Sequence, residues 1–247
     1  MTFLLWQNRR MAKPWMIDEL VHAGAEHLEP AFIAGYDRKA GCDRADGSDP
    51  TDDLAELRAH GLSSGATLVD LGAGTGRFAL AAAREFARVV AVDVSPAMLH
   101  VLRDRAVDAG LANVDCVQAG FITYAHAGPP ADGIHTRNAL HQLPDFWKVL
   151  ALDRMARMLR PGGVLRIRDL IYDFQPGEAE AVLDDWIDGA VDDPSRGYTG
   201  RDFAEHIRTE HSTYRWLFEP MLAAAGFEIV SAEYRRSLYG AYTCIRR

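Results

Sequence analysis

Short apolar runs alternate with longer amphipathic segments over the middle of the chain, between about residues 65 and 170. The runs are of strand length and the segments between them are of helical length. This alternation is typical of βαβ units, in which a parallel sheet is covered by helices. The predicted strands are Thr67–Leu71, Val89–Asp93, Val114–Ala119, Gly133–Thr136 and Val164–Asp169.

The clearest helix is predicted between Pro144 and Leu159, where a proline begins an apolar face and Arg160-Pro161-Gly162-Gly163 ends it. Further helices are predicted over 178–190, 201–210 and 214–225, and two strand-like runs follow over 227–234 and 238–245. The first sixty residues show a broken helical pattern, with apolar positions between Met16 and Val21 ahead of a polar stretch over 37–53 that favours a loop.

Charge and cysteine content narrow the class of partner. The 247 residues include 35 acidic and 27 basic side chains, and the resulting net charge of −8 opposes the counterion release that drives nucleic-acid binding. Cys42, Cys116 and Cys244 form no CxxC pair, so neither a disulfide framework nor a zinc knuckle is indicated. No apolar run approaches the roughly twenty residues of a membrane span, and no signal peptide is recognised. We expect a cytoplasmic protein that binds no metal, nucleic acid or membrane and is compatible with a homodimer.

A glycine-rich turn follows the first predicted strand, in the order Val69-Asp70-Leu71-Gly72-Ala73-Gly74-Thr75-Gly76. Glycines let the backbone approach a ligand closely. Asp93 ends the next predicted strand, where a carboxylate can accept both hydroxyls of a ribose. A glycine trio alone is also explained by an ordinary strand-to-helix turn. The loop and the acid together indicate an adenosine-type ligand.

The spacing of the glycines indicates which kind of adenosine cofactor the loop suits. It reads GxGxG, and Arg77 stands at the position where a dinucleotide-binding loop has its third glycine. The charge of Asp70 repels a pyrophosphate and attracts an ammonium group. These features argue against a nicotinamide dehydrogenase.

Four ordered segments resemble the class I S-adenosylmethionine-dependent methyltransferases. Their first motif reads as Asp70–Gly76 and their second is the acid at Asp93, while 132–143 and 159–165 look like the fourth strand with its loop and the turn into the fifth. The resemblance implies an α/β fold: a Rossmann-like, doubly wound, mostly parallel seven-stranded sheet with a reversed C-terminal hairpin, N-terminal helices and a helical insertion after the fifth strand.

The resemblance also implies that residues 1–247 form one domain, whose parts have different roles. Residues 1–60 would form an N-terminal helical cap, 65–170 the cofactor-binding core, 178–212 a helical cover over the substrate, and 213–247 the closing helix and hairpin. The implied cofactor is S-adenosyl-L-methionine, bound by Asp70, Gly72, Ala73, Gly74, Thr75, Gly76, Asp93, Val94, Met98, Gly120, Phe121 and Asn138.

One departure from the family pattern concerns adenine. Many members carry an acid just after the third strand to bind the adenine amino group, whereas this chain reads Gln118-Ala119-Gly120-Phe121. Gln118 or the backbone near Gly120 could serve instead. Phe121 could pack on the base, or it could belong to the core.

Methyl transfer is an in-line displacement that depends mainly on holding the acceptor near the methyl carbon. His141 follows the fourth predicted strand and is the candidate general base, with a packed structural histidine as the alternative. Candidate substrate residues are Tyr36, Arg137, Asp169 and Tyr172. The function expected is methylation of a small molecule. An RNA methyltransferase and a non-catalytic S-adenosylmethionine-binding module stay open as alternatives.

Overall fold

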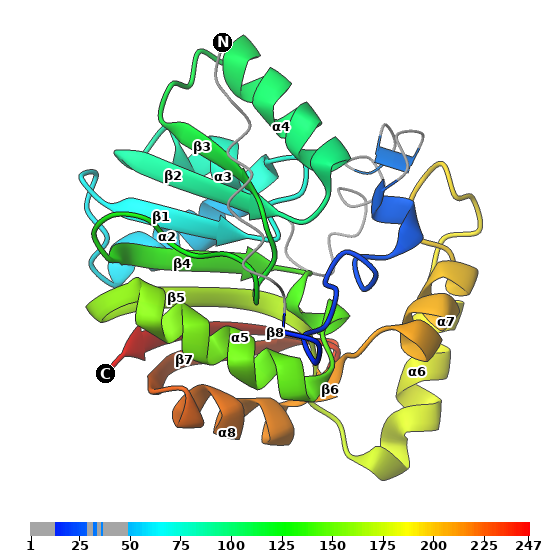
Figure 1. Ribbon diagram of the computed structural model, residues 1–247. Helices are drawn as coiled ribbons and strands as arrows, with labels where there is room; N and C mark the ends of the chain where they lie inside the picture. The colour runs from blue at the N-terminus through cyan, green and yellow to red at the C-terminus, as the bar shows by residue number, and fades with distance from the viewer. Residues whose placement is uncertain (1–12, 29–31, 34–35, 37–48) are drawn as a thin grey trace.

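The computed structural model describes residues 13–28, 32–33, 36 and 49–247. A twisted sheet runs through the centre of the molecule, with helices against both of its faces (Figure 1). The strand order is β3-β2-β1-β4-β5-β8-β7, and the two-residue strand β6 pairs with β5 outside this path. The seven strands of the main path confirm the expected seven-stranded sheet, and β6 is an addition to it.

The first five strands are parallel, and the last two close the sheet as an antiparallel hairpin. Strand order reverses between β1 and β4: the chain runs outward from β1 to β3 and then returns to pair β4 on the other side of β1. Ligands bind at such switch points, outside the carboxyl ends of the strands. The strands are β1 (Thr67–Leu71), β2 (Arg88–Asp93), β3 (Val114–Gln118), β4 (Ala131–Arg137), β5 (Leu159–Tyr172), β6 (Thr213–Tyr214), β7 (Phe227–Arg235) and β8 (Tyr239–Arg246).

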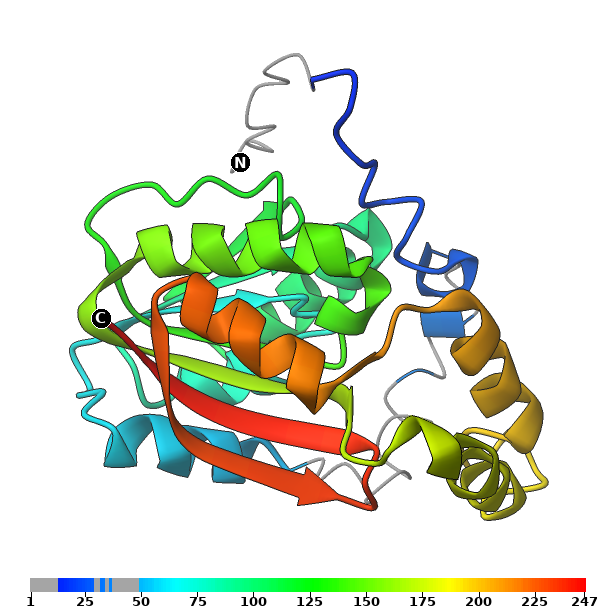
Figure 2. The same ribbon diagram turned by 90° about the horizontal axis from the view of Figure 1, so that it is seen from below.

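Two helical layers bury the two faces of the sheet, as Figure 2 shows from below. Alternate residues of β1 point to opposite faces: Val69 packs in the core with α5 (Asp145–Met158) and α8 (Arg215–Ala224), whereas Leu68 packs in the core with α2 (Pro50–Ala59), α3 (Arg77–Ala82) and α4 (Pro96–Asp108). Because both faces are covered, most residues of β1 and β2 are apolar, and two polar side chains inside the sheet, Asp70 on β1 and His135 on β4, are buried and paired with each other. The apolar runs are why the positions of β1 and β2 could be predicted from the sequence.

The predicted helical insertion after the fifth strand is present. It consists of η4 (Pro176–Glu178), α6 (Ala179–Asp188) and α7 (Gly200–Thr209), which lie together at one end of the sheet. Trp186 of α6 stacks on Phe203 of α7 with ring centroids 4.3 Å apart, and both pack on Tyr239 and the end of β5. Aromatic burial therefore fixes this insertion to the core.

The N-terminal segment differs from the helical pattern expected between Met16 and Val21. It forms turns, followed by the short helix η1 (Ala25–Leu28). The Asp18 carboxylate accepts a hydrogen bond from the Leu20 amide, and the Val21 amide donates to the Asp18 carbonyl. Such local side-chain bonds compete with helix formation, which explains the difference. Cys42, Asp37 and most of the polar stretch over 37–53 lie outside the described residues.

None of the helices in the part of the chain that the structure describes combines the length and apolar character needed to cross a bilayer.

Candidate functional site

A cavity opens at the carboxyl ends of the parallel strands, beside the switch point between β1 and β4. It holds about 710 Å³ of empty space, a figure that includes its open mouth. Five stretches of chain line it: the N-terminal segment and the segments that follow β1, β2, β3 and β4. The lining residues are Glu19, Ala23, His27, Tyr36, Gly72, Gly74, Asp93, Val94, Ser95, Met98, Ala119, Gly120, Phe121, Arg137, Asn138, Ala139, Gln142 and Leu143.

The glycine loop after β1 has a conformation that other residues rarely adopt. Gly72, Gly74 and Gly76 have φ values of +74°, +54° and +88°. A Cβ atom at Gly72 would lie 2.4 Å from the Cβ of Ala139, and one at Gly76 would lie 2.5 Å from the Cγ of Leu102. The glycines therefore permit both the turn itself and its close approach to the β4 loop and to α4.

Asp93 is held rigidly at the end of β2. Its Oδ2 accepts from the Gly74 amide at 2.7 Å and its Oδ1 from the Ser95 amide at 2.8 Å. Burial raises the pKa of Asp93, and the two amide hydrogen bonds oppose that rise. Each oxygen keeps a second lone pair, so the carboxylate can accept a pair of hydroxyl groups from a ligand in the cavity.

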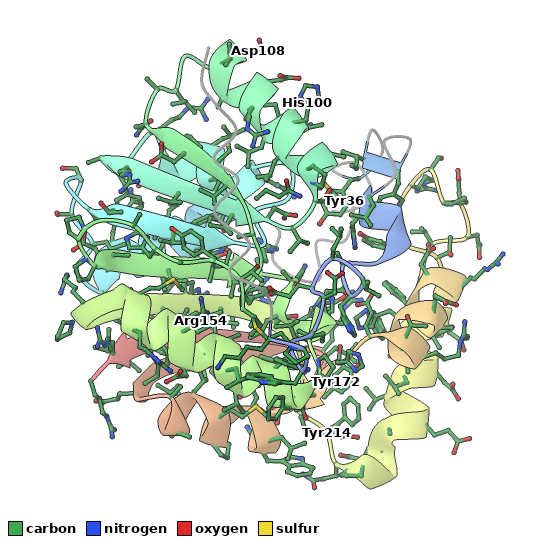
Figure 3. All side chains as sticks on the ribbon, viewed as in Figure 1. Tyr36, His100, Asp108, Arg154, Tyr172 and Tyr214 are labelled. Carbon is green, nitrogen blue, oxygen red and sulfur yellow. The ribbon has the colours of Figure 1, made fainter. Side chains whose placement is uncertain are left out.

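The N-terminal segment covers part of the same cavity. Ser95, which caps α4, donates from its hydroxyl to the His27 carbonyl at 2.9 Å. The imidazole of His27 packs edge-on against Tyr36, with centroids 5.7 Å apart. Figure 3 places Tyr36 beside the end of α4 that is opposite to Asp108. Glu19, on the same segment, is 6% exposed and reaches the loop after β3.

Asp70 lies under the glycine loop and does not line the cavity. Its Oδ1 is 2.8 Å from the Nδ1 of His135 on β4, and the His135 ring stacks on Phe78. Beyond His135 lies Asp53 of α2, whose Oδ1 accepts from the Nε atoms of Arg166 at 2.8 Å and Arg168 at 2.6 Å. Although burial alone would raise the pKa of Asp53, His135 and the two arginines hold it far below its usual value. This buried network supports the floor of the site.

His141 belongs to a second buried network, which we call the His141 cluster: His141, Asp169, His206 and Glu210. Its Nδ1 lies 2.5 Å from Asp169 Oδ1 and its Nε2 lies 2.8 Å from Glu210 Oε2. Burial alone would lower the pKa of His141, but the two carboxylates outweigh it and raise the pKa to about 10. The imidazole is therefore charged at neutral pH, which favours a structural role over that of a general base.

Three members of the His141 cluster offer ligand-type atoms within 4.8 Å of one another: His141, His206 and Glu210. Glu210 Oε2 lies 2.5 Å from His206 Nδ1 and 2.8 Å from His141 Nε2. Ligands of a tetrahedral zinc ion stand about 3.3 Å apart, given bonds of about 2.0 Å. The two ion-pair contacts of Glu210 are shorter than this spacing, and we assign no metal here.

The structure divides the residues singled out in the sequence into two groups. Those that line the cavity are Gly72, Gly74, Asp93, Val94, Met98, Gly120, Phe121, Asn138, Tyr36 and Arg137. Those that do not are Asp70, Ala73, Thr75, Gly76, His141, Asp169 and Tyr172. The Asp169 carboxylate accepts hydrogen bonds from the amides of Leu140 and His141. Tyr172 packs on Phe174 and Tyr214, and Figure 3 shows Tyr172 beside Tyr214.

Sequence reasoning missed Glu19, His27, Ser95 and Gln142, which also line the cavity. Ser95 could have been recognised as the N-cap before Pro96. Glu19 gave no local signal, because its hydrogen-bond partners lie more than a hundred residues away in the chain.

Residues 68–163 match the family model of a methyltransferase domain. Over this segment the chain is similar to methyltransferase domains, and its fold is that of the Rossmann-like methyltransferases. Solved structures of the same fold include the magnesium protoporphyrin IX methyltransferase of Synechocystis with bound SAH (TM-score 0.67, 14% identity, 93% of this chain and 100% of that one). The [4+2]-cyclase SpnF has the same fold too (TM-score 0.62, 20% identity, 81% and 80%).

Curated relatives match part of the chain. A ubiquinone biosynthesis O-methyltransferase of Xylella fastidiosa is 33% identical over 102 residues, which is 41% of each chain. The methyltransferase GfsG of Streptomyces halstedii is 35% identical over 114 residues, 44% of this chain and 40% of that one. The chain thus spans about two fifths of the length of these relatives.

Proposed function

We propose that the protein binds S-adenosyl-L-methionine in this cavity and transfers its methyl group to a small-molecule acceptor. The observation that carries the proposal is the pairing of Asp93 with the glycine loop. The Asp93 carboxylate at the end of β2 accepts a hydrogen bond from the Gly74 amide. The group that would bind the ribose is therefore fixed to the glycine loop.

The residues present fit this cofactor. Asp93 can accept the ribose hydroxyls, and the positive-φ glycines leave room for a ligand against the backbone. Asn138, itself at φ +47°, lies on the opposite wall, where its amide donates to the Arg168 carbonyl. S-adenosylmethionine supplies an activated methyl group, so the work of the protein is to bind, orient and exclude water.

A small-molecule acceptor is favoured by two observations. The net charge of −8 disfavours an RNA substrate. Two of the similar proteins are named for small molecules, ubiquinone and magnesium protoporphyrin IX. We also propose that the chain forms a single domain. In this domain the methyl acceptor would bind between the N-terminal segment and the α6–α7 insertion. The fold alone does not fix the reaction, since SpnF is a cyclase.

No general base is assigned in this proposal. The His141 imidazole is held as a cation by Asp169 and Glu210, and it does not line the cavity. Proximity to the sulfonium methyl is sufficient for an acceptor that arrives ionised or carries a free lone pair.

Replacing Asp93 by Ala tests whether this carboxylate binds the ribose. We expect the dissociation constant for S-adenosylhomocysteine to rise at least tenfold by calorimetry, because a ribose loses charge-assisted hydrogen bonds of about 1.5–3 kcal/mol each. The matched control is Asp108→Ala, an exposed acid at the far end of α4 (Figure 3). Equal affinity in the wild type and in Asp93→Ala would show that Asp93 does not bind the ribose.

Methyl transfer itself is tested by a screen of phenols, amines and carboxylates for acceptor-dependent release of S-adenosylhomocysteine. We expect at least one class to stimulate release and Asp93→Ala to abolish the stimulation at limiting cofactor. Tight cofactor binding with no stimulation by any class would favour the non-catalytic binding module.

A further inference from the structure

Glu19 occupies the space into which a side chain at position 120 would project. A Cβ atom placed on Gly120 would lie 2.4 Å from both Cδ and Oε1 of Glu19 and 2.6 Å from its Oε2. Gly120 does not have a positive φ, so its backbone would accept an L-residue. A side chain at position 120 would therefore displace the Glu19 carboxylate from its place in this structure.

The same carboxylate makes the hydrogen bonds that a short acid at position 120 would make. The amides of Ile122 and Thr123 donate to Glu19 Oε1 and Oε2 at 2.9 and 3.0 Å, and the Thr123 hydroxyl donates to Oε2 at 2.9 Å. These amides are two and three residues beyond position 120, where an Asp side chain caps a turn locally. Glu19 thus caps the turn after β3 from 103 residues away.

Glu19 also lines the cavity in which we propose that the ligand binds. It lines the cavity next to Gly120 and Phe121, and it is 6% exposed. Oε2 accepts two of the three hydrogen bonds and Oε1 only one, so Oε1 keeps acceptor capacity. A buried carboxylate with a lone pair directed at a cavity favours a ligand that donates a hydrogen bond.

We propose that Glu19 and Gly120 are a matched pair, in which Glu19 supplies from the N-terminal segment the carboxylate that recognises the exocyclic amino group of the ligand's purine. This inference rests on the proposed function and names the residue that selects adenine over other bases. It makes the N-terminal segment part of the cofactor site and not only a cover for it.

The pair is tested by moving the carboxylate back to position 120. Binding of S-adenosylhomocysteine and of S-inosylhomocysteine, in which a carbonyl replaces the 6-amino group, is measured by calorimetry for the wild type, Glu19→Ala, Glu19→Gln and Glu19→Ala/Gly120→Asp. Glu180→Gln, an exposed acid on α6, is the control. Melting temperatures without ligand show which variants are folded.

We expect the wild type to prefer the adenine ligand by about 10- to 100-fold, the range for one hydrogen bond to a charged group. Glu19→Ala and Glu19→Gln should lose most of this preference, and the double variant should recover at least part of it. Gly120→Asp alone should bind poorly, because two carboxylates would compete for one space.

Two results would overturn the inference: an unchanged preference in folded Glu19→Ala and Glu19→Gln, or equal losses for both ligands without recovery in the double variant. The second result would make Glu19 a cap only. Absence of S-adenosylhomocysteine binding by the wild type would instead refute the proposed function, so the two failures are distinguishable.

Discussion

Replacement of His141 by Gln changes the charge of the His141 cluster and is expected to change how stability depends on pH. The pKa of His141 is raised to about 10 in the folded protein, against about 6.5 in an unfolded chain. Protonated His141 therefore contributes its full stabilisation of the fold below pH 6.5. This contribution to the free energy of unfolding is lost as the pH rises toward 10. One proton contributes at most about 1.4 kcal/mol per pH unit. Over three units the wild type should therefore lose about 2–4 kcal/mol that the variant does not lose.

The assay is urea unfolding of the wild type and of His141→Gln at pH 6.5, 8.0 and 9.5. The difference in unfolding free energy should be largest at pH 6.5 and should shrink by about 2–4 kcal/mol at pH 9.5. His100→Gln, an exposed position on α4, is the control and should follow the wild type. Parallel curves for the wild type and His141→Gln would mean that the folded imidazole is neutral, and the role of His141 as a base would become attractive again.

Two further substitutions test the supports of the cavity. Asp53→Ala leaves the buried guanidinium groups of Arg166 and Arg168 without their shared acceptor, and we expect a loss of about 3–5 kcal/mol in urea unfolding; a loss below 1 kcal/mol would show that the network is dispensable. Gly76→Ala should lower the free energy of unfolding by about 2–4 kcal/mol, because of the positive φ and the contact with Leu102. The control is Gly110→Ala, at φ +66° with open space around it, which should lower it by only about 1–2 kcal/mol. Equal losses for the two variants would contradict the steric contribution of Leu102.

The strands and the glycine loop could be predicted because the local sequence determines them. β1 has the predicted bounds, and β2, β3 and β4 differ from theirs by one or two residues at an end, since each contains a short run of apolar or β-branched residues between longer segments. Asp93 was recognised for the same reason, because it stands where β2 ends. The positive φ values of the glycines agree with the turn expected there.

Contacts between distant parts of the chain could not be predicted. Nothing near Asp70 indicates that its partner is His135, and nothing near His141 indicates that Glu210 from the segment after α7 will reach it. Glu19 is the clearest case, since the glycine at position 120 is recognisable as a departure but its replacement lies in another segment. In each case the pairing depends on tertiary packing, which local propensity does not encode.

The central claim, that this cavity binds S-adenosylmethionine, is tested most directly by urea unfolding of the wild type with S-adenosylhomocysteine and, separately, with NAD. We predict that S-adenosylhomocysteine raises the unfolding free energy by about 2.7 kcal/mol at one hundred times its dissociation constant, and that NAD at the same concentration leaves it unchanged. Stabilisation by NAD with no effect of S-adenosylhomocysteine would contradict the claim.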